Sequence, residues 1–238
     1  MTVDKREARV REMFSAISPR YDFLNHLLSL NVDHYCRWRT TRLVPVMDGG
    51  PVLDLCTGTG DLALAYNRHA RGRVPIVGAD FCHEMLVLGE KKARHVGTNG
   101  HIRFIEADAQ RLPFPDNYFQ IVSVAFGLRN VTNTERGLSE MVRVTRPGGK
   151  VAILEFSMPR NRLLRALYLG YFRHVLPLIG QTLARNRAGA YNYLPSSVLE
   201  FPDGQAMLEL MRRVGLKSPQ WHPLTFGIAS LYVAIKGA

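Results

Sequence analysis

The sequence predicts an α/β fold built on a doubly wound sheet of seven strands. Short apolar runs alternate with helical patterns from Pro51 onward, which is the order of elements in such sheets. The first run, residues 52–55, passes into a glycine-containing turn, and acidic residues stand at the ends of the first three runs. Ligands of open α/β sheets lie outside the carboxyl ends of the strands, so the same features predict a ligand site.

The elements follow in a regular order along the chain. Residues 4–46 are expected to form helices interrupted near Ser18-Pro19 and Asn31. Strands are expected near 51–56, 74–79, 102–106, 119–125, 149–157, 217–223 and 229–236, and helices near 60–70, 83–96, 134–146 and 203–214. Asp203 is the expected N-cap of the last helix, since its carboxylate can accept from the first backbone amides.

One domain of residues 1–238 is expected, with four parts. These are an N-terminal helical cap (1–48), a ligand-binding core (49–158), a helical insertion after the fifth strand (159–200), and a C-terminal helix and hairpin (201–238).

Composition favours one packed domain in a reducing compartment. A chain of 238 residues with 46% hydrophobic and 21% charged residues can bury one full core. Cys36, Cys56 and Cys82 lie far apart without a C-x-x-C pair, so neither a zinc site nor a disulfide framework is indicated. The first residues lack the apolar stretch of a signal peptide, and no segment has the roughly 18 apolar residues of a spanning helix. We therefore expect a cytoplasmic protein, either soluble or bound to the inner face of a membrane.

The net charge of +11 is concentrated near the end of the chain. Residues 161–238 hold nine Lys and Arg against three Asp and Glu, and no acid occurs between Glu155 and Glu200. Within residues 160–187, arginines are interleaved with leucine and aromatic residues. Three interpretations are open: an element on a membrane surface, a buried helix edged by solvated arginines, and a nucleic-acid patch. A nucleic-acid partner is disfavoured because no helix-turn-helix or RNA-binding signature accompanies the charge.

The turn after the first strand fits two classes of cofactor. Read as Gly58-x-Gly60-x-x-Ala63, it matches the dinucleotide fingerprint, with Asp80 as the ribose-binding acid, and predicts an NAD-dependent oxidoreductase. In such a site the helix N-terminus meets a pyrophosphate, which the carboxylate of Asp54 would repel. S-adenosylmethionine (SAM) instead brings a sulfonium and an ammonium. The turn therefore favours SAM over NAD, and a turn without any ligand is the remaining alternative.

Two later acids extend the cofactor site. Asp80 ends the second strand, where a carboxylate can accept from both hydroxyls of a ribose. Asp108 follows the third strand and is placed for the amino group of an adenine. Because the carboxyl ends of successive strands meet at one edge, we expect Asp54, Asp80 and Asp108 to lie along one ligand.

Longer segments resemble a known family. They are Phe126-Gly127-Leu128-Arg129-Asn130-Val131, Arg143 to Lys150 continuing into Leu154-Glu155-Phe156-Ser157, His174 to Gly180, Tyr191 to Leu194, and Tyr21 to Ser29. In these segments the chain resembles class I SAM-dependent methyltransferases, which have a Rossmann-like fold, and more narrowly the ubiquinone/menaquinone biosynthesis C-methyltransferase family. The resemblance covers most of the chain from about residue 13. It implies methyl transfer from SAM to a ring carbon of a polyprenylated quinol. Demethylmenaquinol is the first expectation, and a ubiquinone-pathway benzoquinol is the alternative.

The resemblance also assigns residues to the cofactor. It implies SAM contacts at Thr59, Asp80, Asp108 and Ala109, with Asp54, Gly58 and Gly60 around them. Ala125 stands where the family has a serine contact, which removes one hydroxyl. The chain departs again at Cys36, where the family pattern has a tryptophan, and Trp38 follows two positions later.

The chemistry requires a quinol, because a ring carbon becomes nucleophilic when the adjacent hydroxyl loses its proton. Arg129 is expected to stabilise the phenolate and Asn130 to orient it, since both directly follow the fourth strand at the cofactor edge. The alternative is that this pair only satisfies loop carbonyls. His174 is the candidate general base, because imidazole titrates near neutrality, or else a packing residue. A substrate with an isoprenoid tail further predicts peripheral membrane association through residues 160–187. The sequence makes no prediction of oligomeric state.

Overall fold

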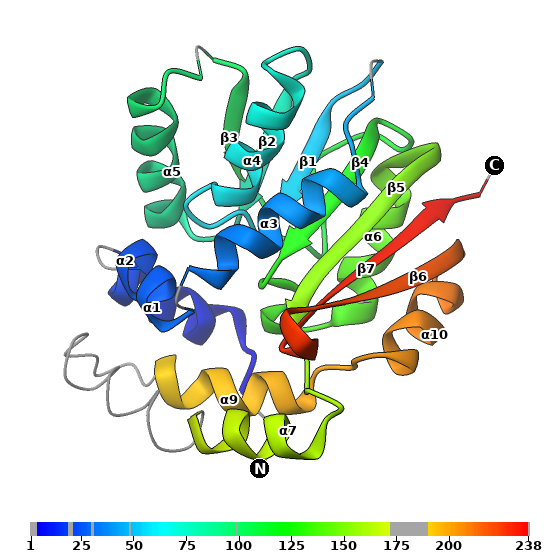
Figure 1. Cartoon of the computed structure of the whole chain (residues 1–238). Coiled ribbons are helices and arrows are strands. Elements are labelled where there is room, and N and C mark those ends of the chain that lie inside the picture. The colour runs from blue at the N-terminus through cyan, green and yellow to red at the C-terminus, as the bar shows by residue number, and fades with distance from the viewer. Residues whose placement is uncertain are drawn as a thin grey trace.

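A seven-stranded sheet forms the centre of the computed structural model, which describes residues 4–18, 21–29, 31–47, 49–98, 100–171 and 190–237 (Figure 1). The strands are β1 (Val52–Leu55), β2 (Ile76–Asp80), β3 (Ile102–Glu106), β4 (Phe119–Ala125), β5 (Thr145–Phe156), β6 (Leu216–Leu224) and β7 (Ala229–Lys236). Their order is β3-β2-β1-β4-β5-β7-β6, and β7 runs antiparallel to both of its neighbours. The predicted α/β fold with a doubly wound sheet is confirmed.

Helices cover both faces of the sheet (Figure 1). The helices that follow the strands are α4 (Asp61–Ala70), α5 (His83–His95), α6 (Thr134–Val144) and α10 (Gln205–Arg213). Leu53 and Leu55 of β1 pack in one core cluster with residues of α6 and α10, whereas Val52 packs in a second cluster with residues of α4. Successive side chains of a strand point to opposite faces, so β1 is apolar on both sides except at Asp54.

The carboxyl edge of the sheet is covered by helices from two distant parts of the chain. They are α1 (Glu7–Ile17), α2 (Tyr21–Leu28) and α3 (Val32–Leu43) from the beginning, and α7 (Arg162–Gly170) and α9 (Ala190–Glu200) from the insertion. Figure 1 shows α1, α2, α7 and α9 together below this edge. Met13 and Ile17 of α1 share an apolar cluster with Tyr168 of α7 and Val198 of α9. None of the helices in the described ranges is both long and apolar enough to span a membrane.

The interruptions predicted in the N-terminal helices are present. Helix α1 ends at Ile17 and α2 begins at Tyr21, while Asn31 precedes α3 in the left-handed conformation with φ of 61°. A short polar residue such as asparagine tolerates this conformation better than most side chains.

Two local predictions are wrong. The boundary between the helix predicted near 134–146 and the strand predicted near 149–157 lies earlier: the helix ends at Val144, and the strand begins at Thr145, which pairs with Phe119 of β4. Pro147 follows two residues later, and the residue before a proline is disfavoured in a helix. The predicted cap Asp203 does not cap α10: Gly204 occupies that position, and the Asp203 carboxylate accepts from the backbone of Met158 at 3.2 Å.

Candidate functional site

A cavity of about 850 Å³ lies at the carboxyl edge of the sheet. The predicted site residues that line it are Asp54, Gly58, Thr59, Asp80, Asp108, Ala109, Ala125, Arg129 and Asn130. They come from the turn after β1 and from the ends of β2, β3 and β4. The structure therefore brings together residues from four neighbouring strands around one space.

Gly60 was predicted to contribute to the cofactor site, but it is not among the residues that line this cavity. It precedes α4 with φ of 82°, and a Cβ built on it would lie 2.7 Å from the ring of Phe104. Gly58 has φ of 56° and lies at the cavity. Both glycines adopt a conformation that side chains rarely adopt, but Gly60 is also needed so that Phe104 can pack against the turn.

Asp54 is a buried acid with one unused oxygen. Its Oδ2 accepts from the Thr57 hydroxyl at 2.6 Å and from the Ala63 backbone at 3.0 Å, whereas its Oδ1 is buried and has no partner among the described residues. Burial raises the pKa of the Asp54 carboxyl to about 7. A buried acceptor that lines a cavity suits a ligand with a positively charged donor, as SAM has in its ammonium group.

Asp80 and Asp108 are fixed by local hydrogen bonds. Asp80 accepts from the backbone of Gly58 at 2.8 Å and of Cys82 at 2.9 Å, and burial raises its pKa above the ordinary value. Asp108 accepts from the backbone of Gln110 at 2.9 Å. These bonds hold both carboxylates at the cavity, Asp80 at the end of β2 and Asp108 after β3.

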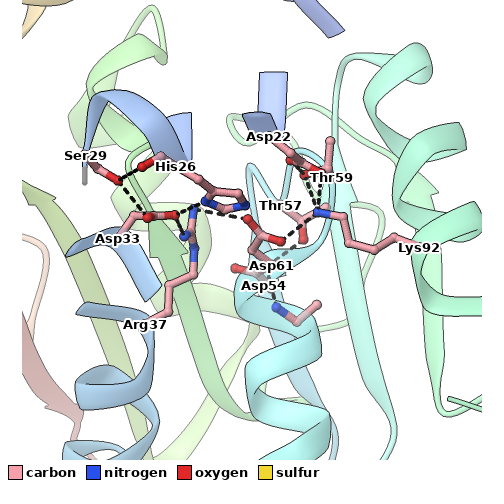
Figure 2. Close-up of polar contacts among 11 residues, drawn as sticks. Asp22, His26, Ser29, Asp33, Arg37, Asp54, Thr57, Thr59, Asp61 and Lys92 are labelled. Carbon is pink, nitrogen blue, oxygen red and sulfur yellow. Dashed lines mark hydrogen bonds and ion pairs between the residues drawn. The ribbon is translucent and has the colours of Figure 1, made fainter. Parts of the chain in front are cut away.

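Thr59 connects the turn to the helical cap (Figure 2). Its hydroxyl donates to Asp22 of α2 at 2.5 Å and accepts from Lys92 of α5 at 3.0 Å. Lys92 also pairs with Asp22 at 2.6 Å and with Asp61 at 2.7 Å. The resemblance implies a SAM contact at Thr59; in the structure the Thr59 hydroxyl has two protein partners and connects the turn to α2.

Helix α3 adds a cation that the sequence analysis missed. Arg37 lines the cavity with a side chain 12% exposed, and it pairs with Asp33 one turn earlier and with Asp61 at 3.5 Å. Asp33 also accepts from Ser29 at 2.7 Å and from His26 at 2.8 Å (Figure 2). The i, i+4 spacing of Asp33 and Arg37 in the sequence could have predicted that the two side chains pair on one face of the helix.

Arg129 and Asn130 belong to η2 (Leu128–Asn130), which follows β4, and both line the cavity. Arg129 Nη1 donates to the carbonyl of Phe126 and to Glu155 Oε2 at 2.8 Å. Arg129 Nε and Asn130 Oδ1 are buried and have no hydrogen-bond partner within the part of the chain that the structure describes. Arg129 therefore satisfies a loop carbonyl and in addition has one N–H donor without a partner there. Glu155 was not predicted as a partner of Arg129. An acid within the apolar run of β5 could have indicated a buried residue that needs a charged partner.

The space beyond Arg129 is apolar. Its walls include Phe156, Pro159, Leu164, Leu167, Tyr168, Leu194, Phe226 and Ile228. Leu164, Leu167 and Phe226 are 37%, 64% and 85% exposed, so the cavity reaches the surface between α7 and η4 (Thr225–Gly227). Phe226 is held there in a left-handed conformation with φ of 58°. The cavity is thus lined by acids near the glycine turn and by apolar side chains, of which Leu164, Leu167 and Phe226 are exposed and form an apolar mouth.

The remaining predicted residues are placed differently. His174, the candidate base, lies outside the described residues, as do residues 172–187 of the basic, apolar segment. Cys36, which stands at the family's tryptophan position, is buried and lines the cavity. Trp38 is 49% exposed beside Arg42 and is not among the cavity residues.

Comparison with known proteins identifies close relatives. A sequence model of the ubiE/COQ5 methyltransferase family matches residues 1–236. The chain is 47% identical over 229 residues to a ubiquinone/menaquinone biosynthesis C-methyltransferase UbiE of Geobacter sulfurreducens, covering 96% of this chain and 89% of that protein. It is 46% identical over 235 residues to a demethylmenaquinone methyltransferase of Deinococcus radiodurans, covering 98% and 94% of the two chains.

A solved structure confirms the fold at low sequence identity. The [4+2]-cyclase SpnF superposes with a TM-score of 0.69 over 96% of both chains at 18% identity. At this identity the likeness concerns the fold alone, and a cyclase with the same fold shows that the fold does not determine the reaction. The family match and the two relatives confirm the resemblance predicted from the motifs. The chain belongs to the ubiE/COQ5 methyltransferase family.

Proposed function

We propose that this protein transfers the methyl group of SAM to a ring carbon of a polyprenylated quinol, converting demethylmenaquinol to menaquinol. One observation carries the proposal: a single cavity is lined by three acids from successive strand ends, by Arg129, and by a set of apolar side chains. Its volume of about 850 Å³ is in the upper part of the range of about 300–1,000 Å³ typical of ligand sites. The family membership supports the same activity.

The acidic half of the cavity fits SAM. The unpaired Oδ1 of Asp54 can accept from the ammonium, Asp80 from the ribose hydroxyls, and Asp108 from the adenine amino group. When bound, SAM supplies an electrophilic methyl group on its sulfonium. NAD fits less well, since its pyrophosphate would have to lie beside the buried carboxylate of Asp54.

Arg129 and Asn130 are placed to act on the quinol. The buried Nε–H of Arg129 can donate to the quinol oxygen as negative charge develops on it, and Asn130 can orient the same group. The surrounding apolar walls exclude water, which strengthens this interaction. His174 keeps its proposed role as a general base.

The apolar mouth supports a substrate with a long isoprenoid tail. Leu164, Leu167 and Phe226 form an outlet through which a tail can leave the cavity toward a membrane. Leu163 of α7 is 70% exposed beside them, and Arg162 and Arg165 lie exposed on the same helix. Exposed leucines with arginines are typical of an interfacial helix, so residues 160–187 are proposed to bind the membrane surface peripherally.

Methyl transfer from radiolabelled SAM tests the proposal directly. Purified protein should label demethylmenaquinol, and a ubiquinone-pathway benzoquinol assayed in parallel decides between the two acceptors. Labelling of neither quinol by protein that binds SAM would reject the substrate class. Binding of NAD without binding of SAM, measured by isothermal titration, would reject the enzyme class.

A further inference from the structure

Two opposite charges face the cavity beside the glycine turn. Asp54 contributes a buried oxygen without a protein partner, and Arg37 contributes a guanidinium whose side chain is 12% exposed. A buried polar atom without a partner is costly, so the Asp54 oxygen marks where a cationic group of a ligand fits. Arg37 is already paired with Asp33 and Asp61, but its guanidinium has further donors for an anionic group.

The order of the strands gives the direction of the ligand along the edge. Asp108 follows β3 and Asp80 ends β2, so the base and sugar of SAM extend over these two strands. The next strands in the sheet are β1 and β4, and the methionyl part must point toward them. Arg37 lies there: it pairs with Asp61, the first residue after the β1 turn, and its guanidinium carbon lies 5.9 Å from the ring centre of Phe126, directly after β4.

Among the described residues, Arg37 and Arg129 are arginines that line the cavity; Arg129 is proposed to face the quinol, and Arg37 lies beside the glycine turn with Asp61. Figure 2 shows Arg37 and Lys92 on opposite sides of Asp61. Lys92 is held by Asp22, Asp61 and Thr59, and it is not among the residues that line the cavity. Arg37 does line it, and a guanidinium has five N–H donors in a planar fork, enough for Asp33, Asp61 and one further carboxylate.

We propose that Arg37 binds the carboxylate of the methionyl part of SAM, while Asp54 accepts from its ammonium. The inference rests on the proposed use of SAM. The proposed contact makes the N-terminal helical cap part of the cofactor site, since α3 would supply the group that binds the carboxylate of SAM. The neighbouring acids Asp33 and Asp61 hold the guanidinium in place for this contact.

Decarboxylated SAM provides the test, because it lacks the carboxylate and keeps both the sulfonium and the ammonium. Binding of each compound is measured by isothermal titration to the full chain, without quinol. The unsubstituted protein should prefer SAM by about tenfold or more, as expected for a charge-assisted pair. In Arg37→Gln the affinity for SAM should fall by about tenfold while that for decarboxylated SAM changes little, so the preference disappears.

Lys92→Gln is the matched control, since it removes a cation from the same network away from the cavity. It should leave the preference for SAM unchanged, whatever its effect on overall affinity. The inference is wrong if Arg37→Gln keeps the full preference. Equal binding of SAM and decarboxylated SAM by the unsubstituted protein would also reject the inference. This comparison does not depend on whether a variant folds. Failure to bind either compound would instead reject the proposed cofactor.

Discussion

Arg129 and Glu155 form a buried ion pair beside the cavity. Arg129 Nη1 lies 2.8 Å from Glu155 Oε2, and the backbone amide of Arg129 donates to Glu155 Oε1 at 3.2 Å. The two side chains are 8% and 1% exposed. Glu155 thus holds both the backbone and the guanidinium of Arg129, and it keeps the buried positive charge compensated.

Glu155→Gln should lower turnover of demethylmenaquinol by about tenfold to a hundredfold, because the guanidinium loses the carboxylate that orients it. The affinity for SAM should stay within about twofold, since Glu155 is not among the cavity residues. Steady-state kinetics and isothermal titration measure the two quantities. Glu135→Gln, which breaks the exposed pair with Arg213, is the control and should change neither. Unchanged turnover in Glu155→Gln would contradict a positioning role.

Arg129→Met should lower the free energy of unfolding by about 3–5 kcal/mol, because Glu155 is left buried without its partner. Replacing both residues, as Arg129→Met with Glu155→Leu, should recover most of this stability but no activity. Urea unfolding and the methyl-transfer assay separate the two effects. A stable double variant with normal turnover would show that Arg129 has only a structural role.

Binding of SAM should release protons near neutral pH. The pKa of Asp54 is raised to about 7 by burial, so at pH 6.5 the carboxyl is mostly protonated before binding. A bound ammonium favours the ionised carboxylate and lowers this pKa. Affinity should therefore rise as the pH rises from 6 to about 7, where α-ammonium groups, with a pKa of about 8, remain charged.

Titration calorimetry at pH 6.5 in buffers of different ionisation enthalpy measures the released fraction of a proton. In Asp54→Asn this release should be absent and the affinity for SAM lower. Equal release by both proteins would assign the proton to another group.

Gly60→Ala should destabilise the protein by about 1–3 kcal/mol more than Gly97→Ala. Both glycines have positive φ, but a Cβ at Gly60 would lie 2.7 Å from Phe104, whereas a Cβ at Gly97 meets nothing within 4 Å. The difference between the two variants in urea unfolding therefore reports the contact with Phe104. Equal losses would indicate that backbone conformation alone sets the cost.

Liposome co-sedimentation should detect binding that needs anionic lipid and weakens at high salt. Replacing Leu163 and Leu167 by serine should reduce the bound fraction several-fold, because both are exposed on α7. Met47→Ser is the control, since Met47 is 63% exposed in the loop after α3, away from α7. Binding that does not depend on anionic lipid, or that survives loss of both leucines, would contradict the proposed surface.

The sheet and its row of acids could be predicted because their signals are local. Each strand is a short apolar run, and Asp54, Asp80 and Asp108 are fixed at strand ends by the run that precedes them. The parallel order then brings them to one edge. The predictions that failed at Thr145 and Asp203 concern the ends of helices. The end of a helix depends on which hydrogen-bond partner a residue has in the fold, and the sequence does not show that partner.

The ion pairs of the site could not be predicted in the same way. Glu155 meets Arg129 across two neighbouring strands, and Thr59 meets Asp22 across 37 positions of the chain. Such pairs depend on how the elements pack and not on any spacing in the sequence. Arg37 was missed for this reason. Its pair with Asp33 is local in the sequence, but its position at the cavity depends on how α3 packs against the rest of the protein.

The packing of α1 has a consequence for biosynthesis on the ribosome. Met13 and Ile17 of α1 share an apolar cluster with Tyr168 of α7 and Val198 of α9, which are translated much later than α1. The apolar face of α1 therefore lacks these partners during translation until α7 and α9 have been synthesised.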